Sequence, residues 1–250
     1  GLQRGQIPIG EIRLGVYGNE DPMYILAGLP FIAPDYSTAW LLKDLAKGYI
    51  DNAFKEKGLK ILYYTPWPGQ GFYTKFPVNS TSDFKGKKLR IYSTATQKMG
   101  QMLGFNATIL PFAEIPQAFS TGLIEALFTS PQTGIDIQAW DNTKHFTYAG
   151  AIFSKNAVVV GEKYFSALSA NDQSNMLAAA ARAELRGWEM SAATTVAQMA
   201  ILKKNGMTVV NAPDSVITKM KEIGKEMMAG WRKDASPEAI AVLDRYLALQ

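Results

Sequence analysis

The chain has 250 residues, of which 47% are hydrophobic and 19% charged, and it contains no cysteine. Disulfides, thiolate metal sites and cysteine nucleophiles are therefore excluded, while the length allows one large domain or two smaller ones, each with a substantial core. The net charge of +4 is spread along the sequence rather than gathered into a basic stripe, so the composition does not favour nucleic-acid binding.

Strand and helix signals alternate along the N-terminal part of the chain. Apolar residues that recur every three or four positions indicate helices, and short apolar runs bounded by glycine and proline indicate strands. The expected elements are a strand at residues 7–12, a helix from Ser37, a separate helical turn at residues 51–57 set off by breaks at Gly48 and Gly58, and a strand at residues 59–64.

Two segments are predicted to cross between domains. Residues 67–71 cannot be helix interior, because Pro68 restricts the residue before it and the two glycines leave the backbone free to turn. Residues 154–156 form a second candidate crossing, since they precede a strand of buried type at residues 157–160. The chain is therefore expected to pass between two domains at these points.

The second half of the chain shows further alternation of strands and helices, which is typical of a mostly parallel sheet covered by helices. One predicted helix contains no proline over residues 171–204, and at about 1.5 Å rise per residue it spans roughly 50 Å. This length exceeds one small domain, so the helix is expected to support both. The remaining elements are strands at 89–92, 107–110 and 207–210, and helices at 96–103, 114–121, 215–231 and after Ser236.

Arg90 is the main candidate for a binding residue. It ends a basic run that begins at Lys85, and it lies near the mouth of the strand predicted at residues 89–92. A planar guanidinium in this place can bind a carboxylate with two parallel charge-assisted hydrogen bonds, which lysine cannot reproduce. A solvated basic run at the start of a strand is the alternative interpretation, because charge runs usually cover solvated faces.

Several short motifs occur in a specific order. They are Gly10-Glu11 after a short strand, NEDP at 19–22, GLPF at 28–31, KGKKLR at 85–90, PFAEIPQAFSTGLIEAL at 111–127, and LSANDQ at 168–173. Together they resemble the solute-binding proteins of tripartite ATP-independent periplasmic (TRAP) transporters, of the DctP type. The resemblance implies an α/β fold of two lobes, similar to periplasmic binding proteins, with crossing strands and one long helix that bridges both lobes.

The resemblance also implies a division of the chain. Residues 1–67 and 155–193 are expected to form lobe I, and residues 68–154 and 194–250 to form lobe II. Relatives usually begin with a further strand-helix-strand unit, so lobe I is expected to lack its first unit here. The GQENP segment of relatives is replaced by residues 126–131, which indicates a less polar wall facing the ligand.

Ligand-binding roles follow from the resemblance residue by residue. Arg90 matches the clamp for the ligand carboxylate, Thr129 lies where many relatives place an asparagine that touches it, and Gln70 lies where some relatives have a second arginine. Phe112 matches an aromatic residue over the ligand, although core packing is an equally good interpretation of it. The residues expected to line the ligand are Arg90, Phe112, Thr129, Gln70, Trp67, Glu11 and Ser130.

The kind of ligand follows from the charges near this site. Neutral side chains at Gln70 and Thr129 leave Arg90 as the single firm cation, which predicts a monocarboxylate rather than a dicarboxylate. Aromatic residues near the site favour an apolar or aromatic body, for example an aromatic or branched 2-oxo or 2-hydroxy acid.

The expected function is capture of an organic acid in the periplasm, by a monomer, and its delivery to the membrane subunits of a TRAP transporter. A sensory receptor of the same fold that signals to a membrane kinase is the alternative. No enzyme is expected, because His145 is the only histidine and no Gly-x-Ser-x-Gly elbow occurs. No cofactor is expected, while a cation that assists the ligand stays open, since some relatives use one.

Targeting signals are not evident in the sequence. No run of about 18 apolar residues occurs, and residues 1–5 do not resemble a signal peptide. Either a targeting segment has been removed or none was present. The absence of cysteine is compatible with a bacterial periplasm without proving it.

Overall fold

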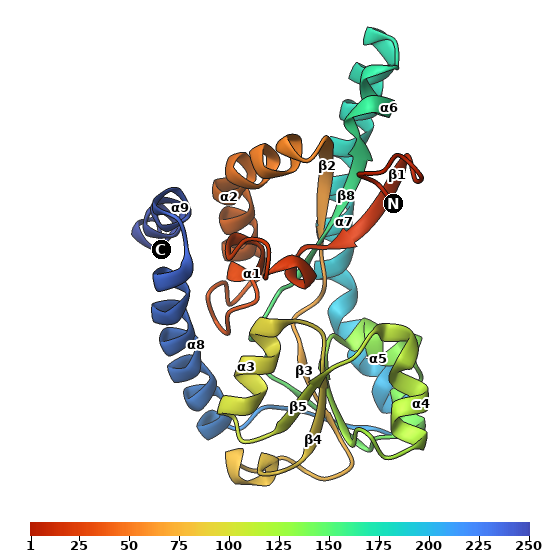
Figure 1. Ribbon diagram of the computed structural model, residues 1–250. Helices are drawn as coiled ribbons and strands as arrows, with labels where there is room; N and C mark the ends of the chain where they lie inside the picture. Colours follow the sequence, from red (N-terminus) through yellow and green to blue (C-terminus); the bar gives the residue numbers. More distant parts are fainter.

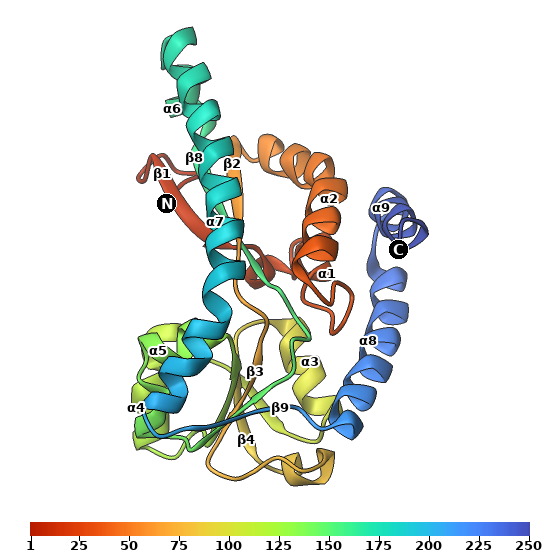
Figure 2. The ribbon, with the colours of Figure 1, turned by 180° about the vertical axis from the view of Figure 1, so that it is seen from behind.

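The computed structural model describes all 250 residues, which form two lobes joined by crossing segments and one long helix (Figures 1 and 2). Lobe I is built on a three-stranded antiparallel sheet in the order β1 (Ile9–Arg13), β8 (Lys155–Gly161) and β2 (Leu59–Pro66). Helix α2 (Tyr36–Glu56) and the middle of α7 (Ala170–Lys204) both pack against β2. The two-lobed architecture expected from the motifs is confirmed.

Lobe II is built on a six-stranded sheet. Its order is β5 (Asn106–Ile109), β4 (Lys88–Ile91), β6 (Ala126–Thr129), β3 (Gly71–Thr74), β7 (His145–Tyr148) and β9 (Thr208–Asn211). Strand β4 runs parallel to β5 and β6, and β7 runs parallel to β9, whereas β3 is antiparallel to both of its neighbours. The sheet is thus mostly parallel, as predicted, and β3 alone runs against the other five strands, because it enters directly from lobe I and separates the two parallel groups.

Helices cover both faces of the lobe II sheet (Figure 2). One face carries α3 (Thr94–Met102) and α8 (Asp214–Asp234), and the other carries α4 (Ile115–Ser120), α5 (Pro131–Asp136) and the last part of α7. Successive side chains of β3 point to opposite faces of the sheet. Phe72 therefore packs in the apolar cluster under α3 and α8, and Tyr73 packs in the cluster under α4. The shorter elements are α1 (Met23–Leu26), α6 (Glu162–Ser166), α9 (Pro237–Ala248), and 3₁₀ turns at Leu14–Tyr17, Thr81–Phe84, Phe112–Glu114 and Ala139–Asp141.

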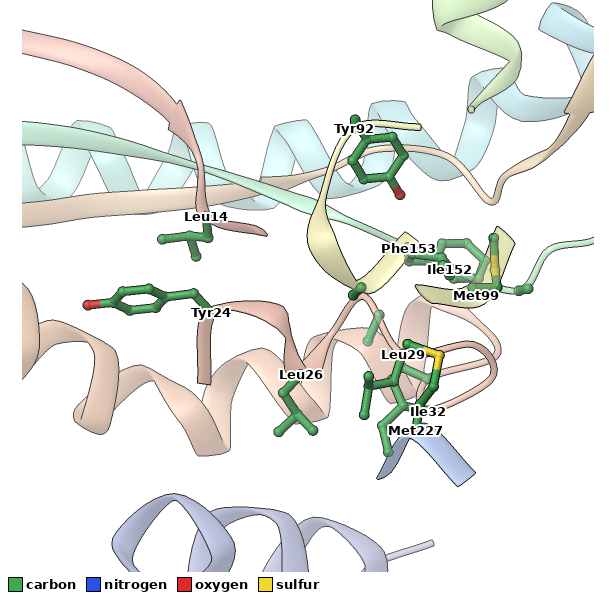
Figure 3. Packing of buried hydrophobic residues seen from close by; sticks show 14 of the residues in the cluster. Leu14, Tyr24, Leu26, Leu29, Ile32, Tyr92, Met99, Ile152, Phe153 and Met227 are labelled. Carbon is green, nitrogen blue, oxygen red and sulfur yellow. The ribbon is translucent and has the colours of Figure 1, made fainter. Parts of the chain in front are cut away.

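A continuous apolar core connects the lobes. Figure 3 shows Leu29 and Ile32 of lobe I, which belong to the same buried cluster as Met99 of α3 and Met227 of α8. Burial of such side chains is worth about 1.5–3 kcal/mol each relative to exposure. The contact between the lobes in this conformation is therefore stabilised by apolar packing as well as by the covalent crossings.

The first predicted crossing is confirmed, and the second lies earlier than the predicted residues 154–156, because Lys155 and Asn156 already belong to β8. Residues 67–70 lead from β2 of the first sheet to β3 of the second, and residues 149–154 return from β7 to β8. Gly71 is required where β3 begins, because a Cβ atom there would lie 2.4 Å from the carbonyl oxygen of Thr147. The long helix is also confirmed, with Ser169 as its N-cap.

Two expectations differ from the structure. Gly48 does not break the helix that starts near Ser37, because α2 runs on to Glu56 with open space around Gly48. A glycine inside a helix costs about 1 kcal/mol of stability relative to alanine, and packing of the apolar face of α2 offsets this cost. In addition, α9 lies on lobe I rather than lobe II: it packs against α2, and the Tyr246 hydroxyl donates to the carbonyl oxygen of Ile32 at 2.7 Å.

No helix combines the length and apolar character that a membrane crossing requires.

Candidate functional site

A cavity of about 240 Å³ lies where the lobes meet. Its walls come from the end of β1 in lobe I, from both crossing segments, and from the ends of β4 and β6 in lobe II. Polar side chains converge on it, which is typical of a site for a small molecule. The lining residues are Arg13, Trp67, Gln70, Arg90, Tyr92, Phe112, Thr129, Ser130, Thr133, Asp136 and Ser154.

Arg90 on β4 is the most buried charged residue of this cavity, with only 1% of its surface exposed. Its Nε donates to the carbonyl oxygen of Leu110 at 3.1 Å, whereas its buried Nη2 has no acceptor and no carboxylate forms an ion pair with it. Burial, helped by the nearby positive charge of Arg13, lowers the pKa of Arg90 to about 10. The guanidinium is still charged at neutral pH, so an anion in the cavity would compensate it.

Arg13 is a second cation in the same cavity. It ends β1, and the centre of its guanidinium lies 4.9 Å from the centre of the Tyr92 ring, while that of Arg90 lies 6.0 Å from the same ring. Its Nε is buried and has no acceptor, and burial lowers its pKa. The expectation that Arg90 is the single cation of the site is therefore wrong.

The signal for Arg13 was present in the sequence as a charged residue at the carboxyl end of the first predicted strand. Glu11, two residues earlier, was expected to line the ligand instead. In the structure Glu11 is exposed, accepts a hydrogen bond from Nδ2 of Asn156 at 2.7 Å, and lines a neighbouring hollow rather than the cavity of Arg90.

Gln70 is held by hydrogen bonds on both sides of its amide. The Tyr92 hydroxyl donates to Oε1 of Gln70 at 2.6 Å, and Nε2 of Gln70 donates to Oγ of Ser154 at 3.0 Å. Burial raises the pKa of Tyr92 to about 12, so its hydroxyl stays a neutral donor at physiological pH. This network joins the end of β4 to both crossing segments.

Thr129 and Ser130 lie at the end of β6, and both are buried. Oγ of Ser130 accepts from the backbone N–H of Thr133 at 3.2 Å and so caps helix α5. Thr129 has no hydrogen bond from its hydroxyl to another side chain, which leaves that group free to meet a ligand.

The rim of the cavity is formed by Phe112 and Asp136 from lobe II and by Trp67 from the crossing. Phe112 is 47% exposed, so it is not a core residue. Nε1 of Trp67 donates to Oδ1 of Asn156 at 2.9 Å, which fixes the indole of the first crossing against the start of β8. Asp136 is the only acidic side chain of the lining.

Six of the seven residues predicted to line the ligand thus come together around one cavity, and Glu11 does not. Whether each of the six contacts a ligand stays a prediction. Sequence reasoning missed Arg13, Tyr92, Thr133, Asp136 and Ser154. No group of three or more histidine, aspartate or glutamate side chains is arranged to hold a metal ion.

Comparisons with known proteins agree with this architecture. The sequence matches the DctP family, described as bacterial extracellular solute-binding protein, family 7, over residues 1–234. A curated relative, the C4-dicarboxylate-binding periplasmic protein DctP of Rhodobacter capsulatus, is 24% identical over 237 residues. The match covers 90% of this chain and 65% of that relative, so the chain spans slightly less than two thirds of the relative's length.

Two solved structures are similar throughout. One is DctP7 of Bordetella pertussis, an extracytoplasmic solute receptor binding pyroglutamic acid, with 36% identity and a TM-score of 0.96 over 98% of this chain and 82% of that one. The other is a marine metagenome TRAP solute-binding protein specific for pyroglutamate, with 32% identity and a TM-score of 0.94 over 99% and 81% of the two chains.

Proposed function

Because this chain belongs to the DctP family of bacterial extracellular solute-binding proteins, which work with TRAP membrane subunits, we propose that it binds a small monocarboxylate between its lobes and delivers it to such a transporter. The proposed carboxylate clamp is Arg90. We expect the protein to act in the periplasm as a monomer, without chemical change to the ligand.

The observation that carries the proposal is the unpaired guanidinium of Arg90. A buried positive charge without a counterion costs several kcal/mol, and an arriving carboxylate compensates it with charge-assisted hydrogen bonds. Thr129 lines the same cavity and can add a hydroxyl donor to the same carboxylate.

A singly charged acid is favoured by the charges of the whole cavity. Arg13 and Arg90 bring two positive charges and Asp136 brings one negative charge, so one positive charge is in excess. A monocarboxylate balances this charge, and a second carboxylate would face Asp136. The two pyroglutamate-binding relatives make pyroglutamate the first ligand to test, and aromatic or branched 2-oxo and 2-hydroxy acids the next.

Binding is coupled to closure of the lobes in this proposal. The ligand selects the closed form only by its higher affinity for that form, and the cavity has lining residues from both lobes that meet the ligand together only when the lobes are closed. A sensory receptor of the same fold would use the same closure, but the relatives described above give no support to that alternative.

The test is calorimetry and thermal unfolding of the purified protein with pyroglutamate, phenylpyruvate and succinate. A ligand at about 100 times its Kd adds roughly 2.7 kcal/mol to the free energy of unfolding, which raises the melting temperature measurably. We expect binding of at least one monocarboxylate and its loss in Arg90→Gln. Clear preference for succinate would contradict the monocarboxylate proposal, and no response to any acid would contradict the binding function.

A further inference from the structure

Two arginines from opposite lobes approach one aromatic ring in the cavity. Arg13 comes from β1 of lobe I and Arg90 from β4 of lobe II, and their guanidinium centres lie 4.9 Å and 6.0 Å from the centre of the Tyr92 ring. Each arginine has one buried nitrogen without an acceptor, Nε of Arg13 and Nη2 of Arg90. Both arginines line the same cavity from opposite lobes, and the protein leaves donors of each guanidinium without an acceptor.

The protein supplies no acceptor for either donor. Neither nitrogen has an acceptor within hydrogen-bond distance, and Asp136 on the rim forms no ion pair with either arginine. The positive charge of Arg13 lies close enough to lower the pKa of Arg90. Arg13 forms no hydrogen bond within the protein and Arg90 forms only that of its Nε to Leu110, so a molecule that fits the cavity is expected to offer acceptors to both guanidinium groups.

We infer that Arg13 is a ligand-binding residue that donates to a second, uncharged acceptor on the acid, a ring or chain carbonyl oxygen away from the carboxylate. This inference rests on the proposed function, in which Arg90 holds the carboxylate. A neutral carbonyl suits Arg13 because Asp136 already offsets one of the two positive charges of the lining. The ligand class is therefore a monocarboxylate that carries a lactam or keto carbonyl.

The position of Arg13 on lobe I gives this contact a second consequence. A ligand with both acceptors connects lobe I to lobe II, whereas an acid with only a carboxylate leaves Arg13 unpaired in the closed form. The closed form therefore binds acids that carry this carbonyl more tightly. Acids without it bind more weakly, because the Arg13 guanidinium is then left unpaired in the closed site.

The experiment uses two acids of similar size, pyroglutamate and cyclopentanecarboxylate, which share the five-membered ring and the carboxylate but differ in the lactam. Their Kd values are measured by calorimetry with the wild-type protein and with Arg13→Met, which retains an apolar stem to pack on Tyr92. Arg13→Lys, which retains the charge, is a second variant, and Arg182→Gln on the exposed surface of α7 is the matched control. Thermal unfolding of each variant without ligand checks that the fold is intact.

We expect the wild type and Arg182→Gln to prefer pyroglutamate by roughly 10- to 100-fold, the scale of one charge-assisted hydrogen bond. In Arg13→Met this preference falls to within about threefold, and in Arg13→Lys it is intermediate. Equal losses for both acids in Arg13→Met would overturn the inference, because a merely structural or electrostatic role acts on both. Equal affinities in the wild type would also overturn the inference while leaving the proposed function in place. Binding of neither acid would overturn the inference, and the proposed function falls as well only if no other acid of the panel is bound.

Discussion

The Tyr92 hydroxyl donates to Oε1 of Gln70 at 2.6 Å, and this hydrogen bond joins the end of a lobe II strand to the segment that crosses between the lobes. Both partners are almost fully buried, with 6% and 2% of their surfaces exposed. The bond therefore belongs to the framework of the site as well as to its lining.

Removing this hydroxyl is expected to destabilise the protein. Tyr92→Phe keeps the ring that lies beside both arginines but leaves Oε1 of Gln70 buried without its donor, at a cost of about 1–3 kcal/mol in the free energy of unfolding. Denaturant unfolding measures this, with Tyr63→Phe, whose half-buried hydroxyl forms no hydrogen bond within the protein, as the control. An unchanged midpoint for Tyr92→Phe would show that the bond does not stabilise the fold.

The clamp is tested by a conservative change. Arg90→Lys keeps the positive charge but loses the planar fork, and we expect a loss of about 1.5–3 kcal/mol in the binding free energy of the cognate acid. Calorimetry gives the affinity, and circular dichroism checks the fold. If the affinity of Arg90→Lys equals that of the wild type, Arg90 does not hold the carboxylate.

Alanine substitutions at Phe112 and Phe72 are expected to distinguish an effect on ligand binding from an effect on stability. Phe112 is exposed at the rim, so Phe112→Ala is expected to change the free energy of unfolding by less than about 0.5 kcal/mol while weakening ligand binding by about 1 kcal/mol. Phe72 is fully buried and stacks on Phe105 at 5.8 Å between ring centres, so Phe72→Ala is expected to cost about 3–5 kcal/mol of stability. Loss of stability in Phe112→Ala without loss of affinity would place Phe112 in the core instead.

The buried Lys155 is expected to make the free energy of unfolding depend on pH. Lys155 lines a second, mostly apolar cavity of about 40 Å³, which is formed mainly by lobe I and shares Arg13, Tyr92 and Ser154 with the candidate site. Burial, with a smaller contribution from the charge of Lys43, lowers the pKa of Lys155 to about 8 from an ordinary value of 10.5. Between these two values the unfolded chain binds more protons than the folded one, so this group makes stability rise as pH increases from about 8 to 10.5.

We expect Lys155→Met to remove this rise and to increase the free energy of unfolding at pH 7 by about 1–3 kcal/mol. The comparison is best made between pH 7 and 9.5, because the raised pKa of Tyr92, about 12, lowers stability only as pH increases above the ordinary tyrosine value of 10. Chemical unfolding of both proteins at several pH values checks the prediction, and parallel pH profiles would contradict it.

The sequence predicted long elements better than short ones. Helix α7 was expected within one residue of its observed start, because a serine cap and an alanine-rich run are local signals. Strand β3 was not expected as a strand, since its four residues are buried on both faces and show no alternation of polar and apolar side chains. The position of α9 on lobe I follows from tertiary packing, which helical periodicity does not contain.

The residues of the candidate site could also be predicted only in part from the sequence. Arg90 could be found from its motif, but Arg13 could be found only by knowing where β1 ends relative to the cavity. Glu11 and Arg13 lie two residues apart on one strand, and at about 3.4 Å per residue the earlier side chain starts roughly 7 Å farther from the strand end. This displacement decides which of the two reaches the cavity, and a sequence pattern of period two cannot decide it.

One indole N–H group donates from lobe II to lobe I: Nε1 of Trp231 in α8 donates to the carbonyl oxygen of Pro22 at 2.6 Å. Two further indoles are fixed on the lobe I side, where Trp67 donates to Asn156 of β8 and Trp188 of α7 donates to the carbonyl oxygen of Tyr64 in β2. The emission of an indole depends on its hydrogen bond and on the polarity around it. Trp231 is therefore an intrinsic optical probe of opening and closing, so that the kinetics of closure can be followed by stopped-flow fluorescence without any attached dye.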